Sequence, residues 1–262
     1  MGIVNVTPDS FSDGGQFFDP RRAAEHGLAL VAAGADLLDV GGESTRPYSD
    51  PVAVDEELRR VEAVVAELSA HSGVPVSIDT SKAAVARAAL DAGAEVINDV
   101  TGLEGDEQML PLAVETQAGV CAMHMLGTPQ TMQDDPSYQD VVSEILAYLR
   151  ARRDMLQAAG IAPGRICLDP GIGFGKTHAH NLELLRQVGR FHELGCPLLL
   201  GPSRKGFIAH VLKAKQCDLA AGTVGVVLAL AAQGVQVVRV HDVQAVSHAL
   251  RLFEACGGLE PG

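Results

Sequence analysis

The feature that most constrains the fold of this 262-residue chain is a regular alternation of short apolar runs with longer helix-like segments. Apolar runs of strand length lie at 2–6, 36–41, 74–79, 94–99, 119–124, 165–169, 196–201 and 235–241. The segments between them are rich in Ala, Leu and Glu, and several close on a glycine, as helices commonly do. Strands that are apolar throughout indicate a parallel sheet whose two faces are both covered.

Eight strand–helix units in about 250 residues match the size of a closed (β/α)8 barrel. We therefore predict an α/β fold of the TIM-barrel class. Residues 1–262 are expected to form a single domain, because no linker rich in Ser, Gly or Pro divides the chain. A doubly wound open sheet is the alternative. Ser81 and Ser137 are expected to start the helices after the third and fifth strands.

The composition limits the classes of partner. The net charge of −13 and the aromatic content of 4%, with no Trp, do not suit nucleic acid or an anionic membrane. The sequence has no basic leader and no apolar run of bilayer length. Its five scattered cysteines predict reduced thiols and a cytoplasmic location. An anionic substrate would therefore have to be held by a local basic cluster or by a metal ion.

Polar side chains stand at the ends of nearly all the predicted strands. They are Asn5, Asp79, Asn98, His124, Asp169, Arg239 and His241, with Ser203, Arg204 and Lys205 after the seventh strand. In a parallel barrel these strand ends meet at one rim, where active sites lie. Any single one could be a helix cap, but Lys205, Arg239 and His241 are not capping residue types.

Arg239 and His241 are two residues apart, so they share one face of the last strand, while Val238 and Val240 point towards the helix layer. Two groups that can carry positive charge on one face make a site for an anion or a flat π system. An ion pair with Asp242 or another neighbouring carboxylate is the alternative.

Two long loops and one glycine-rich turn are further candidates for function. The loops cover 7–20 and 41–51, and loops of this length commonly close over a barrel mouth and exclude water. Plain surface loops are the alternative. The stretch LDPGIGFGKTHAHN at 168–181 looks like a phosphate-binding loop, but Pro170 replaces its first glycine and has no N–H to donate. It is either a turn or part of a site that binds by other means.

A set of motifs, taken in order, resembles dihydropteroate synthase. They are NVTPDSFSDGG at 5–15, GGESTRP at 41–47, SIDTSK at 77–82, INDV at 97–100, MHM at 123–125, DPGIGFGK at 169–176, SRK at 203–205 and RVHDV at 239–243. The family is a (β/α)8 barrel of folate biosynthesis that joins 6-hydroxymethyl-7,8-dihydropterin diphosphate to 4-aminobenzoate and releases pyrophosphate. The resemblance implies a transferase, a homodimer, and sulfonamides as competitors of aminobenzoate.

The resemblance also implies a role for each matching residue. Pterin contacts are implied for Asp79, Asn98, Met123, Asp169, Lys205 and Arg239. Diphosphate contacts are implied for Thr45, Arg46 and His241, and walls of the aminobenzoate pocket for Phe11, Pro47 and Phe174. Ser203 and Val240 complete the implied substrate-contacting set. Asn5 is the implied Mg²⁺ ligand. Asp13 would orient the amine or take its proton, beside Asp79, Lys205, Arg239 and His241 as the other catalytic residues.

One departure from the family pattern falls next to the SRK motif. Many members have a serine there that binds the aminobenzoate carboxylate, whereas this chain has Gly206. Two other functions are alternatives. A related barrel that passes a methyl group from a folate to a corrinoid protein needs neither the lids nor the SRK motif, and both are present here. A pterin-binding paralogue without activity would be expected to have lost one of the polar strand ends, and all are present.

Overall fold

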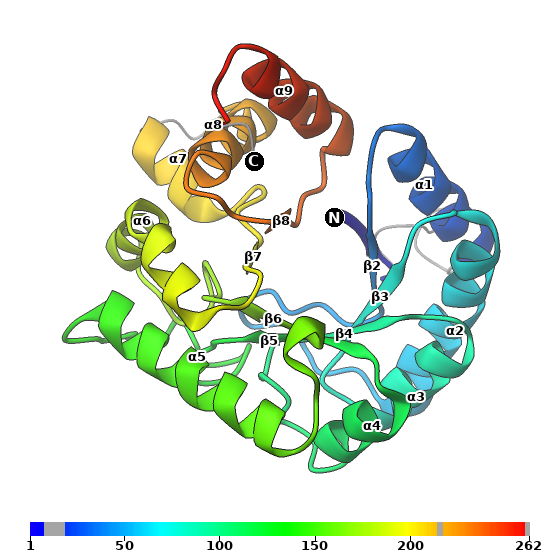
Figure 1. Cartoon of the computed structure of the whole chain (residues 1–262). Helices are drawn as coiled ribbons and strands as arrows, with labels where there is room; N and C mark the ends of the chain where they lie inside the picture. Colours follow the sequence, from blue (N-terminus) through cyan, green and yellow to red (C-terminus); the bar gives the residue numbers. More distant parts are fainter. Residues whose placement is uncertain (8–18, 214–216, 260–262) are drawn as a thin grey trace.

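Eight parallel strands form a ring inside a layer of helices in the computed structural model, which describes residues 1–7, 19–213 and 217–259 (Figure 1). The strands are β1 Gly2–Asn5, β2 Leu38–Gly41, β3 Val76–Asp79, β4 Val96–Asp99, β5 Gly119–Met123, β6 Ile166–Asp169, β7 Leu199–Leu200 and β8 Val237–Val238. The α-helices are α1 Pro20–Ala32, α2 Val54–His71, α3 Ala83–Asp91, α4 Met109–Thr116, α5 Val141–Ala158, α6 His178–Arg186, α7 Gly206–Leu212, α8 Leu219–Ala231 and α9 Val243–Ala255. The 3-10 helices are η1 Pro163–Arg165 and η2 Val188–Leu194.

Hydrogen bonding closes the ring of strands. β1 to β6 pair in chain order and β7 pairs with β8, all in parallel. Two parallel bridges join these sheets, one between Leu168 and Leu198 and one between Gly2 and Val240. The predicted barrel is therefore confirmed, and the alternative of an open sheet is wrong. β7 and β8 are shorter than predicted. Directly before β7, the Leu198 N–H donates to the Gln236 side chain at 2.9 Å and not to a backbone carbonyl.

Alternate strand residues face the helix layer and the inside of the barrel. On β2, Leu38 and Val40 are fully buried in the hydrophobic core, whereas Asp39 lies between them and points the other way. On β3 the same alternation places Ile78 in the core and Asp79 inside the barrel. The core thus lies between the sheet and the helices, and polar side chains are left to gather inside the barrel.

The starts of α3 and α5 differ from the prediction. α3 begins at Ala83, whose N–H donates to Asp106 Oδ2 at 2.8 Å, and Ser81 lies before the helix. α5 begins after Asp140, whose side chain accepts a first-turn N–H at 3.1 Å, so Ser137 is not its cap. In α3 the aspartate comes from the loop before α4, and no local pattern reveals such a partner.

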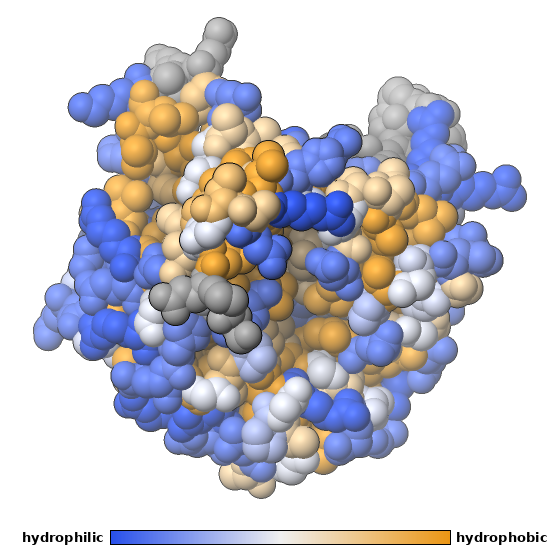
Figure 2. Space-filling view, turned by 45° about the horizontal axis from the view of Figure 1, so that its top comes forward, coloured by the Kyte–Doolittle hydropathy of each residue, from blue (hydrophilic) through white to orange (hydrophobic). Residues whose placement is uncertain are grey.

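The late helices leave hydrophobic side chains at the surface. The buried residues of the apolar helix α8 are Thr223, Val227 and Leu230, so much of it remains partly exposed. Val211 and Leu212 of α7 are each 50% exposed. Figure 2 shows hydrophobic residues gathered at the upper left, over the part of the molecule where Figure 1 places α7 and α8. We call this surface the α7–α8 face.

Candidate active site at the carboxyl end of the barrel

The carboxyl ends of the strands bring the predicted polar side chains to one rim. Asn5, Asp79 and Asn98 lie in one row of the β1–β4 ladders. Asp169, the last residue of β6, pairs in register with Met123 of β5. Apart from the partly exposed Asn5, each of these residues is less than 9% exposed. Hydrogen-bonding side chains from four strands are therefore held inside the barrel, largely removed from water.

Arg239 lies among these groups and is paired with two carboxylates. Its Nε donates to Asp39 Oδ2 at 2.5 Å, and its Nη2 donates to Asp79 Oδ2 at 2.7 Å. Asn98 Nδ2 donates to the same Asp39 oxygen at 3.0 Å. Although burial opposes it, the pairing with Asp39 and Asp79 raises the pKa of Arg239, so the guanidinium stays charged. The result is a fixed, flat cation bordered by acceptors.

Sequence reasoning missed Asp39. This residue is fully buried and accepts hydrogen bonds from both Arg239 and Asn98. Its other oxygen, Oδ1, has no partner among the residues that the structure describes. A carboxylate between Leu38 and Val40, in the middle of an apolar strand, is the signal that could have found it, because a buried carboxylate needs a partner.

Asp79 can change its protonation state near neutral pH. Burial raises the pKa of Asp79 to about 7, while the Arg239 guanidinium opposes the shift and the Asp39 carboxylate adds to it. A group of this kind can accept a hydrogen bond as a carboxylate or donate one as an acid. Perturbed acids in enclosed sites are frequent in enzymes, which makes Asp79 a strong candidate for a functional group.

The glycine-rich turn after β6 uses its N–H groups within the protein. The Gly171 N–H donates to Asp169 Oδ1 at 2.7 Å, and the Gly173 N–H donates to Asn181 Oδ1 at 2.7 Å. The Phe174 N–H donates to the Gly171 carbonyl at 3.1 Å. A phosphate-binding loop directs such groups at its ligand. This turn is therefore part of a different kind of site, and one of its functions is to hold Asp169.

Lys176 and His124 fix this turn to the end of β5, and sequence reasoning assigned neither a role. Lys176 is 2% exposed, and its Nζ lies 2.8 Å from the Phe174 carbonyl oxygen and 3.3 Å from that of His124. The third neighbour of Nζ is His124 Nδ1, at 3.1 Å. Gly171 has a φ of 71°, and a Cβ there would lie 2.0 Å from the His124 carbonyl oxygen. Only glycine allows this approach.

Lys205 crosses from the loop after β7 to the same turn. Its Nζ donates to the Ile172 carbonyl and lies 4.4 Å from the centroid of the Phe174 ring, a cation–π distance. Burial lowers the pKa of Lys205 to about 8, although the Asp169 carboxylate opposes the shift. The structure thus brings together Asp169, Phe174 and Lys205, which are predicted to contact two different substrates.

His241 and Ser203 form the next part of the rim. The backbone N–H of His241 donates to Ser203 Oγ at 3.2 Å, and His241 Nδ1 lies 2.9 Å from the same oxygen. Burial lowers the pKa of His241 to about 4, and the positive charges of Arg204 and Arg239 add to the effect. The imidazole is therefore neutral at pH 7. Asp242 pairs with Arg204, whereas Arg239 forms its ion pairs with Asp39 and Asp79. The alternative of an ion pair is therefore wrong for Asp242 and confirmed for other neighbouring carboxylates.

Known proteins of one family resemble this chain along nearly all of its length. Residues 1–241 match the family described as "Pterin binding enzyme". The dihydropteroate synthase of Neisseria meningitidis serogroup B is 48% identical, over 98% of this chain and 92% of the relative. The chain belongs to the dihydropteroate synthase family. The resemblance inferred from its motifs is therefore confirmed.

Solved structures of this family share the barrel. The dihydropteroate synthase of Xanthomonas albilineans with 4-aminobenzoic acid has a TM-score of 0.92 and 44% identity, covering 99% of this chain and 93% of that one. The Yersinia pestis enzyme with a sulfonamide drug complex has a TM-score of 0.90 and 42% identity, covering 98% and 92%. The predicted fold, and the prediction that the chain is an enzyme of the transferase class, are confirmed.

Among the described residues to which the family resemblance assigns substrate contacts, Val240 has its side chain directed away from the rim. Its side chain packs in the hydrophobic core on the helix side of the barrel. Its N–H donates to the Met1 carbonyl and its carbonyl accepts from the Ile3 N–H, at 3.0 and 3.1 Å. The structure therefore does not bring the Val240 side chain into the site, because the alternation of side chains continues past the end of β8 and directs Arg239 and His241 inwards and Val240 outwards.

The second βα loop, residues 42–52, carries Thr45, Arg46 and Pro47 of the family motif. Thr45 is half-buried, whereas Arg46 and Pro47 are exposed. The positive charge of Arg46 is among those that lower the pKa of His241, which places the loop beside the rim. Phe11 and Asp13, predicted on the first loop, lie outside the described residues, and their roles stay predictions.

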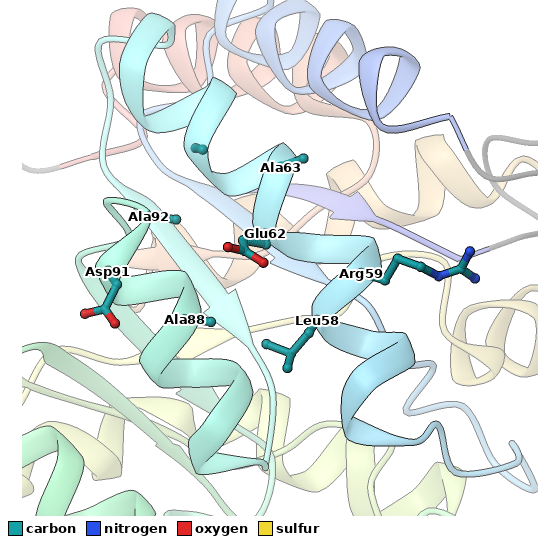
Figure 3. A pocket seen from close by; sticks show the side chains of 8 residues that line it. Leu58, Arg59, Glu62, Ala63, Ala88, Asp91 and Ala92 are labelled. Carbon is teal, nitrogen blue, oxygen red and sulfur yellow. The ribbon is translucent and has the colours of Figure 1, made fainter.

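A hollow between α2 and α3 lies on the outside of the helix layer (Figure 3). It is lined by Leu58, Arg59, Glu62, Ala63, Ala66, Ala88, Asp91 and Ala92. None of the residues that the family motifs single out belongs to this lining. The candidate active site is therefore the rim of the barrel, and the hollow is a feature of helix packing between small side chains.

Proposed function

We propose that this chain joins 6-hydroxymethyl-7,8-dihydropterin diphosphate to 4-aminobenzoate, giving 7,8-dihydropteroate and pyrophosphate in folate biosynthesis. The observation that carries the proposal is the partly buried Arg239, paired with Asp39 and Asp79 beside the buried Asn98 and Asp169, in a member of this family. A pterin ring presents amino, amide and ring-nitrogen groups on one plane. Carboxylates and a carboxamide suit such a ring, because each buried polar group that lacks a partner is costly.

The pterin is held in the barrel by hydrogen bonds and by stacking. Asp79, Asn98 and Asp169 bond its edge, and the flat Arg239 guanidinium lies on its ring. Met123 and Lys205 border the same space. Arg239 is already oriented by its two carboxylates, so little of its side-chain entropy is lost when the ring arrives.

The diphosphate lies at the rim, on Thr45, Arg46 and His241. The Ser203 hydroxyl can donate to His241 Nδ1, which leaves the imidazole proton on Nε2 to be donated to a phosphate oxygen. A neutral imidazole suits this task, since it needs no proton from solvent before the anion binds. Arg46 adds a positive charge from the loop.

Asn5 is a fitting ligand for Mg²⁺ at this position. Its carboxamide is partly exposed at the end of β1, and it makes no hydrogen bond with the other described residues. Mg²⁺ prefers oxygen ligands, keeps several waters and commonly shares few protein groups with phosphate oxygens. No cluster of three or more His, Cys, Asp or Glu that could hold a metal occurs in the described parts of the chain. When bound, the ion would neutralise charge on the diphosphate.

In the reaction, the C–O bond between the pterin methylene and the diphosphate breaks as the aryl amine attacks. Arg239 and His241 stabilise the departing pyrophosphate, and the Asp79 carboxylate stabilises positive charge on the methylene. Asp13 orients the amine or takes its proton. Phe11, Pro47 and Phe174 wall in the aminobenzoate ring, and sulfonamides compete for the same pocket.

The first experiment is to measure pyrophosphate release from the pterin diphosphate with Mg²⁺, in the presence and absence of 4-aminobenzoate. Release that requires aminobenzoate, together with formation of 7,8-dihydropteroate, is the expected result. Tight pterin binding with no such release would instead establish a pterin-binding paralogue without activity.

We also propose that the protein is a homodimer and that the α7–α8 face is its contact surface. This face carries Val211 and Leu212 at half exposure beside the apolar helix α8. Exposed apolar surface of this kind commonly marks a protein interface. Sedimentation at micromolar concentration should give twice the chain mass of 27.4 kDa, and a single-chain mass would contradict the proposal.

A cytoplasmic location completes the proposal. The cysteines Cys121, Cys167, Cys196, Cys217 and Cys256 are free. No helix in the described ranges combines the length and apolar character that crossing a bilayer requires. Cell fractionation with an antibody against the chain would test the location directly.

A further inference from the structure

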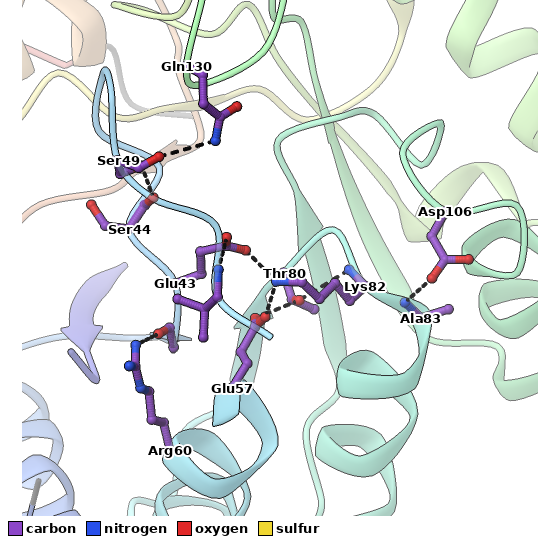
Figure 4. A network of polar contacts seen from close by, with 12 residues as sticks. Glu43, Ser44, Ser49, Glu57, Arg60, Thr80, Lys82, Ala83, Asp106 and Gln130 are labelled. Atoms are coloured by element: carbon purple, nitrogen blue, oxygen red, sulfur yellow. Dashed lines mark hydrogen bonds and ion pairs between the residues drawn. The ribbon is translucent and has the colours of Figure 1, made fainter. Parts of the chain in front are cut away.

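An ionic cluster on the outer side of the rim ties the second βα loop to the helix layer (Figure 4). Lys82 Nζ lies 2.5 Å from Glu43 Oε2 and 2.5 Å from Glu57 Oε2. Thr80 Oγ1 donates to the other oxygen of Glu57 at 2.8 Å. Glu57 is fully buried, and the Lys82 side chain is largely buried, with 22% of its surface exposed. We call Glu43, Glu57 and Lys82 the loop clamp.

Each member of the loop clamp comes from a different part of the fold. Glu57 lies in the first turn of α2, and Lys82 lies directly before α3. Glu43 belongs to the loop itself, two residues before Thr45. Glu57 and Lys82 therefore join two neighbouring helices, whereas Glu43 is the point at which the loop is attached.

Both ends of the loop depend on this attachment. Glu43 Oε1 accepts the backbone N–H of Val52 at 2.8 Å, so one side chain bridges the start and the end of the loop. Arg60 of α2 donates to the Gly42 carbonyl at 2.8 Å and reinforces the start. Beyond Arg46 the loop also contacts the segment after β5. The Tyr48 N–H donates to the Pro129 carbonyl at 3.0 Å, and Gln130 Nε2 donates to the Ser49 carbonyl at 3.1 Å. The segment that carries Thr45 and Arg46 therefore lies between the Glu43 anchor and this second contact.

The attachment of the second βα loop depends on the charge of each residue of the loop clamp. Two carboxylates share one ammonium group in a largely buried setting, so the single positive charge of the lysine attracts both and offsets their mutual repulsion. Without the ammonium, Glu43 and the buried Glu57 would be left as two nearby negative charges, a costly arrangement. The loop end is the more exposed and more easily displaced of the two. Repulsion would therefore move the loop and not the helix.

We propose that Glu43 and Lys82 are positioning residues that hold the second βα loop so that Thr45 and Arg46 meet the diphosphate. The inference rests on the proposed function, since it assigns the loop to the diphosphate part of that site. No member of the loop clamp forms a hydrogen bond or ion pair with a group assigned to the pterin ring. Glu57, whose charge adds to the raised pKa of Asp79, is left in place by both substitutions of the test. Its loss should therefore affect the diphosphate and leave the ring site intact.

The test compares two ligands on four proteins by titration calorimetry with Mg²⁺. The ligands are the pterin diphosphate and 6-hydroxymethyl-7,8-dihydropterin, which lacks the diphosphate. The proteins are the unaltered chain, Glu43→Gln, Lys82→Met and the control Glu62→Gln. Glu62 lies on the exposed side of α2, in the hollow of Figure 3, and is a carboxylate outside the loop clamp.

Glu43→Gln should weaken binding of the pterin diphosphate by about tenfold, or about 1.4 kcal/mol. Binding of the diphosphate-free pterin should change by less than about twofold, and the control should match the unaltered chain for both ligands. Lys82→Met should show the same selectivity with a larger loss. Because Lys82→Met also removes a partner of buried Glu57, its melting temperature is measured alongside, and Glu43→Gln decides the case if that variant unfolds.

Equal affinity of Glu43→Gln and the unaltered chain for the diphosphate ligand would overturn the inference. Equal losses for both ligands would do so too, because they indicate a general structural defect and not a misplaced loop. Failure of the unaltered chain to bind the diphosphate ligand more tightly than the diphosphate-free pterin is a different result. That outcome would count against the proposed function itself.

Discussion

At Asp79, burial and the Arg239 guanidinium act in opposite directions on one carboxyl group, and burial has the larger effect on its pKa. The substitution Asp79→Asn keeps the shape of the side chain and removes its negative charge. We expect the rate of pyrophosphate release to fall about 100-fold, because the amide cannot stabilise positive charge on the pterin methylene. Steady-state kinetics measure the change, and unchanged turnover would remove Asp79 from the catalytic set.

The same residue predicts a pH dependence of stability. The pKa of Asp79 is raised from 3.8 to about 7 in the folded protein. The stabilisation of the folded state that comes from protonated Asp79 is therefore fully present below about pH 4 and is lost as the pH rises through about 7. The melting temperature of Asp79→Asn should accordingly rise relative to the unaltered chain between pH 4 and pH 8. A relative fall would mean that the ion pair with Arg239 outweighs burial.

Gly206 is the residue at which this chain departs from the family motif. A Cβ at this position would lie 3.6 Å from His178 Cε1, which is ordinary van der Waals contact, so a serine fits. We expect Gly206→Ser to lower KM for 4-aminobenzoate by about three- to tenfold, through one hydrogen bond to its carboxylate. Turnover should stay unchanged. Gly164→Ser is the control, since nothing lies within 4 Å of a Cβ there.

Among the elements, the glycine-rich turn depends on Lys176, which contacts Phe174 and His124 from the buried side. Lys176→Met removes these hydrogen bonds and leaves their acceptors buried. We expect a loss of about 1–3 kcal/mol in the free energy of unfolding and a higher KM for 4-aminobenzoate. Denaturant unfolding and kinetics measure the two effects. The exposed Lys213 at the end of α7 provides the control, Lys213→Met. If both substitutions had equal effects, the glycine-rich turn would not depend on Lys176 in particular.

Strands were predictable because their signal is local. The eight apolar runs became the strands, and the polar residues at their ends, such as Asp169 and His241, reached the rim, because alternation along a parallel strand decides which side chains point inwards. The partners of Asp39, and the contact of Lys176 with His124, could not be predicted because those partners lie on or next to other strands. The start of α3 was wrong for the same reason, since its N–H partner Asp106 is distant in sequence.

At the scale of the whole molecule, the site exists only because the ring closes. The two partners of Arg239, Asp39 and Asp79, are 200 and 160 residues away along the chain. The bridge from Gly2 to Val240 aligns β8 with β1, and a slip of one residue would turn Arg239 into the hydrophobic core. The repeat of strands and helices predicts the barrel class, but no local pattern predicts these pairings.

The net charge of −13 acts on the whole molecule and opposes the approach of a diphosphate. The local cations Arg46 and Arg239 offset part of this repulsion, and we expect Mg²⁺ on Asn5 to offset the rest. Chelation with EDTA should therefore weaken binding of the pterin diphosphate by at least about tenfold. Affinity for the diphosphate-free pterin should not change. Calorimetry with and without EDTA measures both.

Asn5→Ala is the matched variant for this prediction, because it removes the only carboxamide assigned to the ion while leaving the pterin contacts in place. Its affinity for the diphosphate ligand should equal that of the chelated protein and should no longer respond to Mg²⁺. If the variant still responds to Mg²⁺, the ion is held by other groups at the rim. If neither chelation nor the variant has an effect, the arginines and His241 suffice to hold the diphosphate against the charge of the molecule.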